Sequence, residues 1–214
     1  MFKPIVSLCT LLLVFSFCNA QDGWVLKSDK DHIKCYSKPV PNSKINAVKL
    51  ESVFTATLSQ FVSVLLDVES FDKWIYKSMS TRLLKRASPS ELFYYSEVDF
   101  PWPTANRDYV SQMKISQDPV SKVVFINAKN VPGWVPVKPG IVRIEQSVGE
   151  WIITPISSNQ IKVEYILKAN PGGDLPGWLI NSFSISGPVE TFKSLREWIK
   201  KPAYVSARLP FITD

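Results

Sequence analysis

The stretch that decides the fold runs from Gln160 to Lys201 and reads QIKVEYILKAN (160–170), PGGDLPG (171–177) and WLINSFSISGPVETFKSLREWIKK (178–201). Its first segment alternates apolar and charged residues, as a half-buried strand does. Its second segment is rich in Pro and Gly and holds Asp174, a favourable N-cap residue, so we predict a turn and then a helix start. Its third segment predicts a long amphipathic helix. The apolar stripe comprises Leu175, Leu179, Ser182, Phe183, Ser186, Val189, Phe192, Leu195 and Ile199. A strand that feeds a long helix across a sheet can close a cavity.

Gly187 and Pro188 interrupt the stripe of this predicted helix. Proline removes a backbone hydrogen bond and clashes with the preceding turn, so we expect a kink or a break at this point. Two interpretations stay open. The kink can serve packing alone, or it can act as a hinge that lets the half with Leu179 and Phe183 lift away and admit a ligand.

Residues 1–20 have the pattern of a secretory signal peptide. Lys3 supplies the positive start, residues 5–17 form an apolar run too short to span a bilayer, and Ala20 ends a small-residue cleavage site. We therefore expect export to a periplasm or secretion, most simply from a bacterium. Removal of this segment leaves residues 21–214 as one domain by length.

Charge and cysteine content exclude several classes of protein. Lys3 is the only charged residue of the first twenty, so 24 basic and 19 acidic side chains remain, for a net charge of +5. These charges are scattered rather than clustered in a stripe, which argues against a nucleic-acid partner. Cys35 is the only cysteine after residue 20 and His32 the only histidine, so we expect no internal disulfide, no metal and no other cofactor. We interpret Cys35 as a small buried apolar residue.

Hydrophobic periodicity over the rest of the chain predicts an α+β domain with one antiparallel sheet. A helix from about residue 58 to 68 is opened by a capping box, Thr57 to Gln60, and a short second helix follows near residues 71–75. Residues 24–31 predict at most one helical turn. Gly149 suggests a bulge or turn within a long strand. The predicted strands cover residues 32–38, 45–54, 80–87, 92–100, 107–117, 122–128, 141–153 and 160–170.

Two proline-rich loops, residues 100–106 and 131–140, each contain one tryptophan, Trp102 and Trp134. Sheet or helix is not expected among so many prolines. Each ring can pack back on the end of the sheet, or it can lie at a rim and contact ligand or membrane. Tryptophan suits the second role because its ring is apolar and its N–H group is polar.

Three motifs resemble the START (StAR-related lipid-transfer) family. Residues 106–110, NRDYV, are similar to its Arg-Asp-aromatic-Val strand, and residues 142–151 resemble its penultimate strand pair. Residues 170–181, NPGGDLPGWLIN, resemble its specific entry into the C-terminal helix. The likeness extends over about residues 22–205.

The resemblance implies a helix-grip fold, in which a curved antiparallel β-sheet wraps around a long C-terminal α-helix and encloses an internal hydrophobic cavity for one lipid. It also implies that the loops at 100–106 and 130–140 gate entry together with the helix. Sterol-binding members have a buried Arg about six residues after the Arg-Asp pair, where this chain has Met113. Sterol specificity is therefore not carried over.

A lipid pocket needs an apolar wall with few polar groups. Alternation supplies candidates, although core wall and cavity wall share one face in such a fold. The candidates for the wall are Tyr109, Met113, Ile115, Val124, Ile144, Trp151, Val163, Tyr165, Leu179 and Phe183.

Two arginines are further candidates for ligand contact. Arg107 can pair with Glu97 or Glu145, or its guanidinium can hold a phosphate or carboxylate headgroup. Arg143 is open to the same two interpretations and also to simple exposure.

The sequence leaves three functions open. The leading hypothesis is non-enzymatic binding of a lipid or other hydrophobic ligand, with transfer between membranes through transient surface contact, by a monomer. A polyketide cyclase or aromatase using the same cavity is an alternative by fold analogy alone. A ligand-sensing module with a protein partner is the third. Movement of lipid between membranes would favour the first function, turnover of an aromatic substrate the second, and binding without transfer the third.

Overall fold

The computed structural model describes residues 23–41, 43, 45–173, 175 and 177–214. The predicted signal peptide and the predicted N-cap Asp174 lie outside these residues. The elements are β1 (Val25–Lys30), β2 (Ile33–Pro39), β3 (Asn46–Thr55), α1 (Leu58–Leu66), the 3-10 turn η1 (Val68–Ser70), α2 (Phe71–Trp74), β4 (Ser78–Ser88), β5 (Glu91–Val98), β6 (Asn106–Gln117), β7 (Val124–Asn130), β8 (Ile141–Arg143), β9 (Gln146–Ser157), β10 (Gln160–Asn170), α3 (Gly177–Trp198) and α4 (Pro202–Val205).

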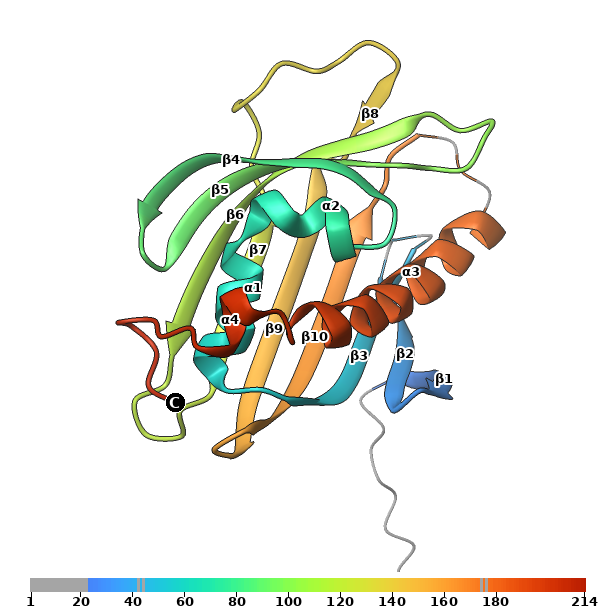
Figure 1. The fold of residues 1–214 in the computed structure, drawn as a ribbon. Coiled ribbons are helices and arrows are strands. Elements are labelled where there is room, and N and C mark those ends of the chain that lie inside the picture. The colour runs from blue at the N-terminus through green and yellow to red at the C-terminus, as the bar shows by residue number, and fades with distance from the viewer. Residues whose placement is uncertain (1–22, 42, 44, 174, 176) are drawn as a thin grey trace, which may run out of the picture.

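The described strands form one curved sheet in the order β1-β2-β3-β10-β9-β7-β6-β5-β4, and β8 adds to β6. Every pairing is antiparallel except that of β8 with β6. Figure 1 shows α3 crossing in front of β9, β10 and β3, with α1 and α2 on the same side of the sheet. The predicted α+β architecture of a sheet around a long helix is confirmed.

Three local predictions on strands are wrong. Residues 24–31 hold strand β1 rather than a helical turn, because they pair with β2 along its edge. The single strand predicted over 141–153 is two strands, β8 on β6 and β9 between β7 and β10. Gly149 makes no bulge, since it stays in register with Leu167 on one side and Ala128 on the other.

Helix α1 begins as predicted, and its capping box is only half formed. The Thr57 hydroxyl accepts a hydrogen bond from the Gln60 backbone N–H at 3.2 Å. The Gln60 side chain does not turn back to Thr57. Its Nε2 donates instead to the carbonyl oxygen of Ile199 at 2.8 Å, which ties α1 to the end of α3.

Helix α3 is continuous from Gly177 to Trp198 and contains Pro188. The helix is therefore not broken at Gly187 and Pro188. The predicted stripe is confirmed in part. Its buried members are Leu179, Val189, Phe192, Leu195 and Ile199. Leu175 and Phe183 are half-buried, Ser186 is exposed against the prediction, and the side chain of Ser182 lies outside the described residues. Its second half is tied down by Arg196, whose guanidinium donates to the carbonyls of Asp31 and His32. Among the described residues no helix has the length and hydropathy needed to cross a membrane.

An aromatic cluster joins the helices to the sheet. Phe54 of β3 contacts Phe61 of α1 and Phe192 of α3, with ring centroids 5.2 and 5.7 Å apart. Trp151 of β9 stacks on Phe192 at 5.7 Å and an angle of 4°. Each such pair contributes about 0.5–1.5 kcal/mol beyond its buried area. Cys35 is free and fully buried beside this core, as interpreted, and burial raises the pKa of its thiol to about 11.

Candidate functional site: an apolar cavity between the sheet and α3

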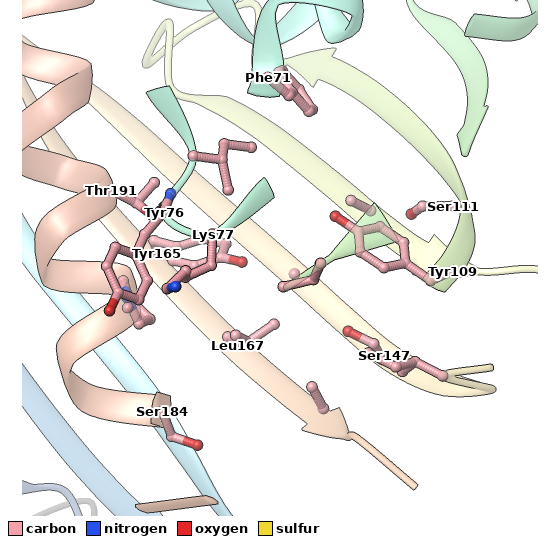
Figure 2. Close-up of a pocket in the computed structure, with 18 of the residues that line it drawn as sticks. Phe71, Tyr76, Lys77, Tyr109, Ser111, Ser147, Tyr165, Leu167, Ser184 and Thr191 are labelled. Atoms are coloured by element: carbon pink, nitrogen blue, oxygen red, sulfur yellow. Dashed lines mark hydrogen bonds between the residues drawn. The ribbon is translucent and has the colours of Figure 1, made fainter. Parts of the chain in front are cut away.

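A cavity of about 270 Å³ lies between the sheet, α2 and α3. Figure 2 shows Tyr109, Ser111 and Ser147 on the sheet side, and Tyr76, Lys77 and Thr191 on the side of the helix. The described residues that line it are Leu65, Phe71, Trp74, Ile75, Tyr76, Lys77, Tyr94, Val98, Phe100, Tyr109, Ser111, Met113, Ala128, Asn130, Ile144, Ser147, Gly149, Trp151, Tyr165, Leu167, Ala169, Pro171, Ile180, Phe183, Ser184, Gly187, Pro188, Thr191 and Phe192.

Strand β6 supplies the wall through alternate residues. Tyr109, Ser111 and Met113 line the cavity, as expected for positions two apart on a strand. Ser111 pairs in register with Tyr94 of β5 and Asn130 of β7, so these three residues form a row across the sheet. The row is polar in a cavity whose other walls are mainly apolar.

Gly149 leaves room for Tyr165 inside the cavity. The two residues lie on adjacent strands, β9 and β10, and a Cβ atom on Gly149 would stand 3.2 Å from the Tyr165 hydroxyl oxygen. The Tyr165 ring packs against Trp151, with centroids 4.2 Å apart. A glycine at this position therefore lets the tyrosine ring lie flat on the sheet.

One end of the cavity is closed by a contact between α3 and the loop after β5. Phe183 stacks on Phe100 with centroids 5.2 Å apart, and its other neighbour is Tyr76 at 6.3 Å. The Tyr76 backbone N–H donates to the Thr191 hydroxyl at 3.1 Å, which holds this turn on α3. A Cβ atom on Gly187 would stand 3.4 Å from the Tyr76 ring, so Gly187 allows the close approach.

Arg107 lies behind this closed end. It is 2% exposed and donates hydrogen bonds to the carbonyls of Ala105, Pro171 and Gly172. Its guanidinium also lies over the Phe100 ring at 4.4 Å. The predicted pairing with Glu97 or Glu145 is wrong, because the strand end brings Arg107 against backbone carbonyls instead. Burial lowers the pKa of Arg107 below its ordinary value.

Arg143 points to the outer face of the sheet. Its Nε and Nη2 donate to the two carboxylate oxygens of Asp108 at 2.6 and 2.9 Å. It also donates to the carbonyls of Val135 and Pro136 at 3.2 Å. Hydrogen bonding to Asp108 raises the pKa of Arg143. Arg143 thus ties the 131–140 loop to β6, and Glu97 pairs with Lys138 of the same loop at 2.9 Å.

The phenols in the cavity are kept neutral. Burial raises the pKa of Tyr94, Tyr109 and Tyr165 above the ordinary value of 10.0. The neighbouring Tyr109 raises the pKa of Tyr94 and Tyr165 further. At physiological pH each hydroxyl can therefore both donate and accept a hydrogen bond.

The predicted wall residues separate into two groups. Those that line the cavity are Tyr109, Met113, Ile144, Trp151, Tyr165 and Phe183, and the predicted gate residues Gly187 and Pro188 join them. Those outside the lining are Ile115, Val124, Val163 and Leu179, which are buried in the core, and Arg107 and Arg143. Contact of any of them with a ligand stays a prediction.

Several lining residues were missed by the sequence analysis, chiefly Tyr94, Ser111, Asn130 and Ser147. An isolated polar residue in a strand is typical of the solvent-facing side, so the residue types did not indicate that these four line a cavity. The one available signal was parity, since Ser111 shares a face with Tyr109 and Met113.

The two rim tryptophans differ. Trp102 is 92% exposed at the tip of the loop between β5 and β6. Trp134 is 40% exposed and stacks on Phe93 with centroids 4.2 Å apart, on the outer face of β5. Figure 1 shows the β5–β6 loop and the N-terminal end of α3 on the same side of the molecule.

A curved antiparallel sheet wraps around a long helix, and the two enclose an apolar cavity. This arrangement defines the helix-grip class of α+β domains. The family model for the START domain matches residues 9–203, and the chain belongs to this family.

Three relatives show how close the likeness is. An uncharacterised protein of Pseudomonas aeruginosa is 31% identical over 180 residues, which cover 84% of this chain and 88% of that one. The crystal structure of a STAR-related lipid transfer protein fragment from Xanthomonas axonopodis is 31% identical, with a TM-score of 0.78, and covers 84% of this chain and 100% of that one. The phosphatidylcholine transfer protein of Rattus norvegicus is 26% identical over 80% of this chain and 81% of its own.

Proposed function

We propose that this protein binds one lipid or similar hydrophobic molecule in the cavity, without chemical change, and carries it between membranes. The observation that supports this most directly is the apolar cavity between the sheet and α3, closed by Phe183 against Phe100. Each methylene group that leaves water contributes about 0.8 kcal/mol, so one acyl chain can supply the affinity. The names of the Xanthomonas and rat relatives agree with lipid transfer.

Release and uptake require the closed end to open. In the first half of α3, Phe183 stacks on Phe100 at the rim. The second half is held by Phe192 and Arg196, and the bond from Gln60 to Ile199 holds the residue that follows it. We take the Gly187–Pro188 segment as the hinge between the two halves. Contact of Trp102 with a bilayer would bring this end to the lipid source.

Holding a ligand, rather than transforming it, agrees with the side chains in the cavity. Within the described lining, the polar side-chain groups are hydroxyls, one amide, the indole N–H groups of Trp74 and Trp151, and Lys77, which pairs with Asp99 at 2.6 Å. Such groups are suited to orienting a ligand by hydrogen bonds. Conversion of an aromatic polyketide would overturn the non-enzymatic proposal.

Native mass spectrometry after incubation with mixed liposomes tests the proposal. We expect one lipid per monomer and its delivery to acceptor vesicles. Ala128→Leu adds volume inside the cavity, so lipid occupancy should fall at least tenfold. Because the added atoms enter cavity space rather than packed core, folding stability should change little. Asn127→Leu places the same side chain at an exposed position on the same strand and should leave occupancy unchanged. A chain that stays empty with every lipid would refute binding.

Export is a second part of the proposal, and it depends on residues 1–20 alone. Lys3 and the apolar run that follows support a cleaved signal. N-terminal sequencing of the protein isolated from its native cells should begin near Gln21. A chain that retains Met1 in the cytoplasm would overturn it.

A further inference from the structure

Apart from Lys77, the polar side chains that line the cavity are uncharged. Lys77 is the only charged side chain among its described lining residues, and its ammonium is paired with Asp99 and 41% exposed at the surface. The two nearest guanidiniums belong to Arg107 and Arg143. They are engaged by backbone carbonyls and by Asp108, outside the lining.

A buried charged group needs a partner of opposite sign or a set of strong hydrogen bonds. A phosphate or carboxylate drawn into this cavity would leave water and meet no described cation that is free to pair with it. The lining therefore favours ligands whose buried part has no net charge.

Five polar side chains of the lining come from the β5, β6, β7 and β9 side of the cavity, and we define them as the patch: Tyr94, Tyr109, Ser111, Asn130 and Ser147. Figure 2 shows Tyr109, Ser111 and Ser147 together on the sheet side of the cavity. Ser111 Oγ donates to the Lys129 carbonyl at 3.1 Å, and Asn130 Nδ2 donates to the Ile144 carbonyl at 2.6 Å. These bonds fix the Ser111 and Asn130 side chains in place and leave their oxygens able to accept a hydrogen bond.

The patch has a defined position along the cavity. On β6 the order is Arg107 behind the closed end, then Tyr109 and Ser111, then Met113 against the apolar core. Beyond Met113 the sheet continues to the row of Ile115, Ile126 and Trp151, and Trp151 stacks on Phe192 in the lining. A ligand with its polar group on the patch would therefore extend its apolar part inward, away from the rim.

Cavity size sets a further limit. The volume of about 270 Å³ is slightly below the range of roughly 300–1,000 Å³ that holds a drug-sized ligand. A phospholipid with two long acyl chains is much larger than such a ligand. A lipid with one chain and a small head comes nearer to this volume than a lipid with two chains, and an uncharged head agrees with the polar patch and with the lack of a free described cation.

We propose that the ligand is a single-chain amphiphile with an uncharged, hydroxyl-bearing head, of the monoacylglycerol class, held by the patch at its head and by the aromatic wall along its chain. This inference depends on the proposed lipid-binding function and narrows it to one class of ligand. Tyr109 can donate to or accept from the head, whereas Ser111, whose proton goes to the Lys129 carbonyl, accepts from it.

A competition experiment with vesicles tests the proposal. The protein is incubated with vesicles that contain equal amounts of monomyristoylglycerol, myristate, dioleoylphosphatidylcholine and dioleoylphosphatidylglycerol, and is then examined by native mass spectrometry. We expect a one-to-one adduct with monomyristoylglycerol at least tenfold above each of the others. A preference for any charged or two-chain lipid would overturn the inference and leave lipid binding standing. Absence of every adduct would refute both.

Two variants test recognition of the head. Ser111→Ala with Ser147→Ala removes two hydroxyls of the patch and should weaken binding of monomyristoylglycerol about tenfold, because each hydrogen bond to the head contributes modestly. Ser184→Ala is the matched control, since Ser184 lines the cavity on α3, away from the patch. Equal affinities of the double variant and the control would show that the patch does not bind the head.

Discussion

Arg143 and Asp108 form a two-pronged ion pair on the outer face of β6, with Nε–Oδ1 and Nη2–Oδ2 distances of 2.6 and 2.9 Å. The Asp108 side chain is fully buried, whereas that of Arg143 is 14% exposed. Arg143→Ala would leave a buried carboxylate without its partner, at a cost of about 3–5 kcal/mol in the free energy of unfolding. Urea denaturation measures the change.

Two further variants show whether the pair is the cause. Adding Asp108→Asn to Arg143→Ala removes the unpaired charge and should restore part of the lost stability. Arg208→Ala removes an exposed arginine and should change stability by less than about 0.5 kcal/mol. A loss from Arg143→Ala as small as that from Arg208→Ala would contradict the argument.

The bond from Gln60 to Ile199 fixes the end of α3 on α1. Gln60 is 8% exposed, and Gln60→Ala would leave the Ile199 carbonyl without this donor. We expect the free energy of unfolding to fall by about 1–3 kcal/mol. Gln160→Ala, at the exposed start of β10, is the matched control and should cost less than about 0.5 kcal/mol. Similar losses of unfolding free energy in both variants would show that the bond from Gln60 to Ile199 does not stabilise the fold.

The sequence predicted the elements well where one periodicity persists. The stripe ending in Phe192, Leu195 and Ile199 identified the buried face of α3, and the alternation around Tyr109 and Met113 identified the inner face of β6. The sequence did not show in the same way which strands pair with each other. The role of β1 depends on contact with β2, and the split between β8 and β9 depends on which neighbour each one joins.

The site was harder to predict than the fold, for a physical reason. Arg107 has the same parity as Tyr109, so alternation places it on the inner face. Whether it reaches the cavity depends on Phe100 in the preceding loop and on residues 171–172, which are distant in sequence; both cover it. Gly149 could be recognised as special, yet its use, room for the Tyr165 ring, appears only when β9 and β10 are paired.

Stability at alkaline pH should report the buried Tyr94 phenol. Tyr94 is 5% exposed, and burial with the neighbouring Tyr109 raises its folded-state pKa well above the ordinary 10.0. The unfolded chain then loses this proton first as the pH rises. Its contribution to stability is therefore complete below about pH 10 and declines above it, by up to about 1.4 kcal/mol per pH unit.

The comparison of wild type with Tyr94→Phe isolates this group. The difference in unfolding free energy should be constant between about pH 7 and pH 9, and above about pH 10 the wild type should lose stability faster. Urea denaturation at successive pH values measures it. Parallel curves up to pH 11 would show that Tyr94 ionises as easily in the folded chain as in the unfolded one.

Trp102 offers the clearest test of membrane contact. Its ring is 92% exposed beside the Phe100–Phe183 contact that closes the cavity. Burial of one large apolar side chain in a bilayer interface contributes about 1.5–3 kcal/mol when complete, so Trp102→Ala should lower vesicle association about tenfold. Vesicle sedimentation measures association, and unfolding free energy should stay within about 0.5 kcal/mol of wild type.

Val120→Ala alters another exposed apolar residue, 88% exposed in the turn after the far end of β6, and should change neither quantity. Equal association of the two variants with vesicles would remove Trp102 from the contact surface and leave lipid binding in the cavity to be judged separately.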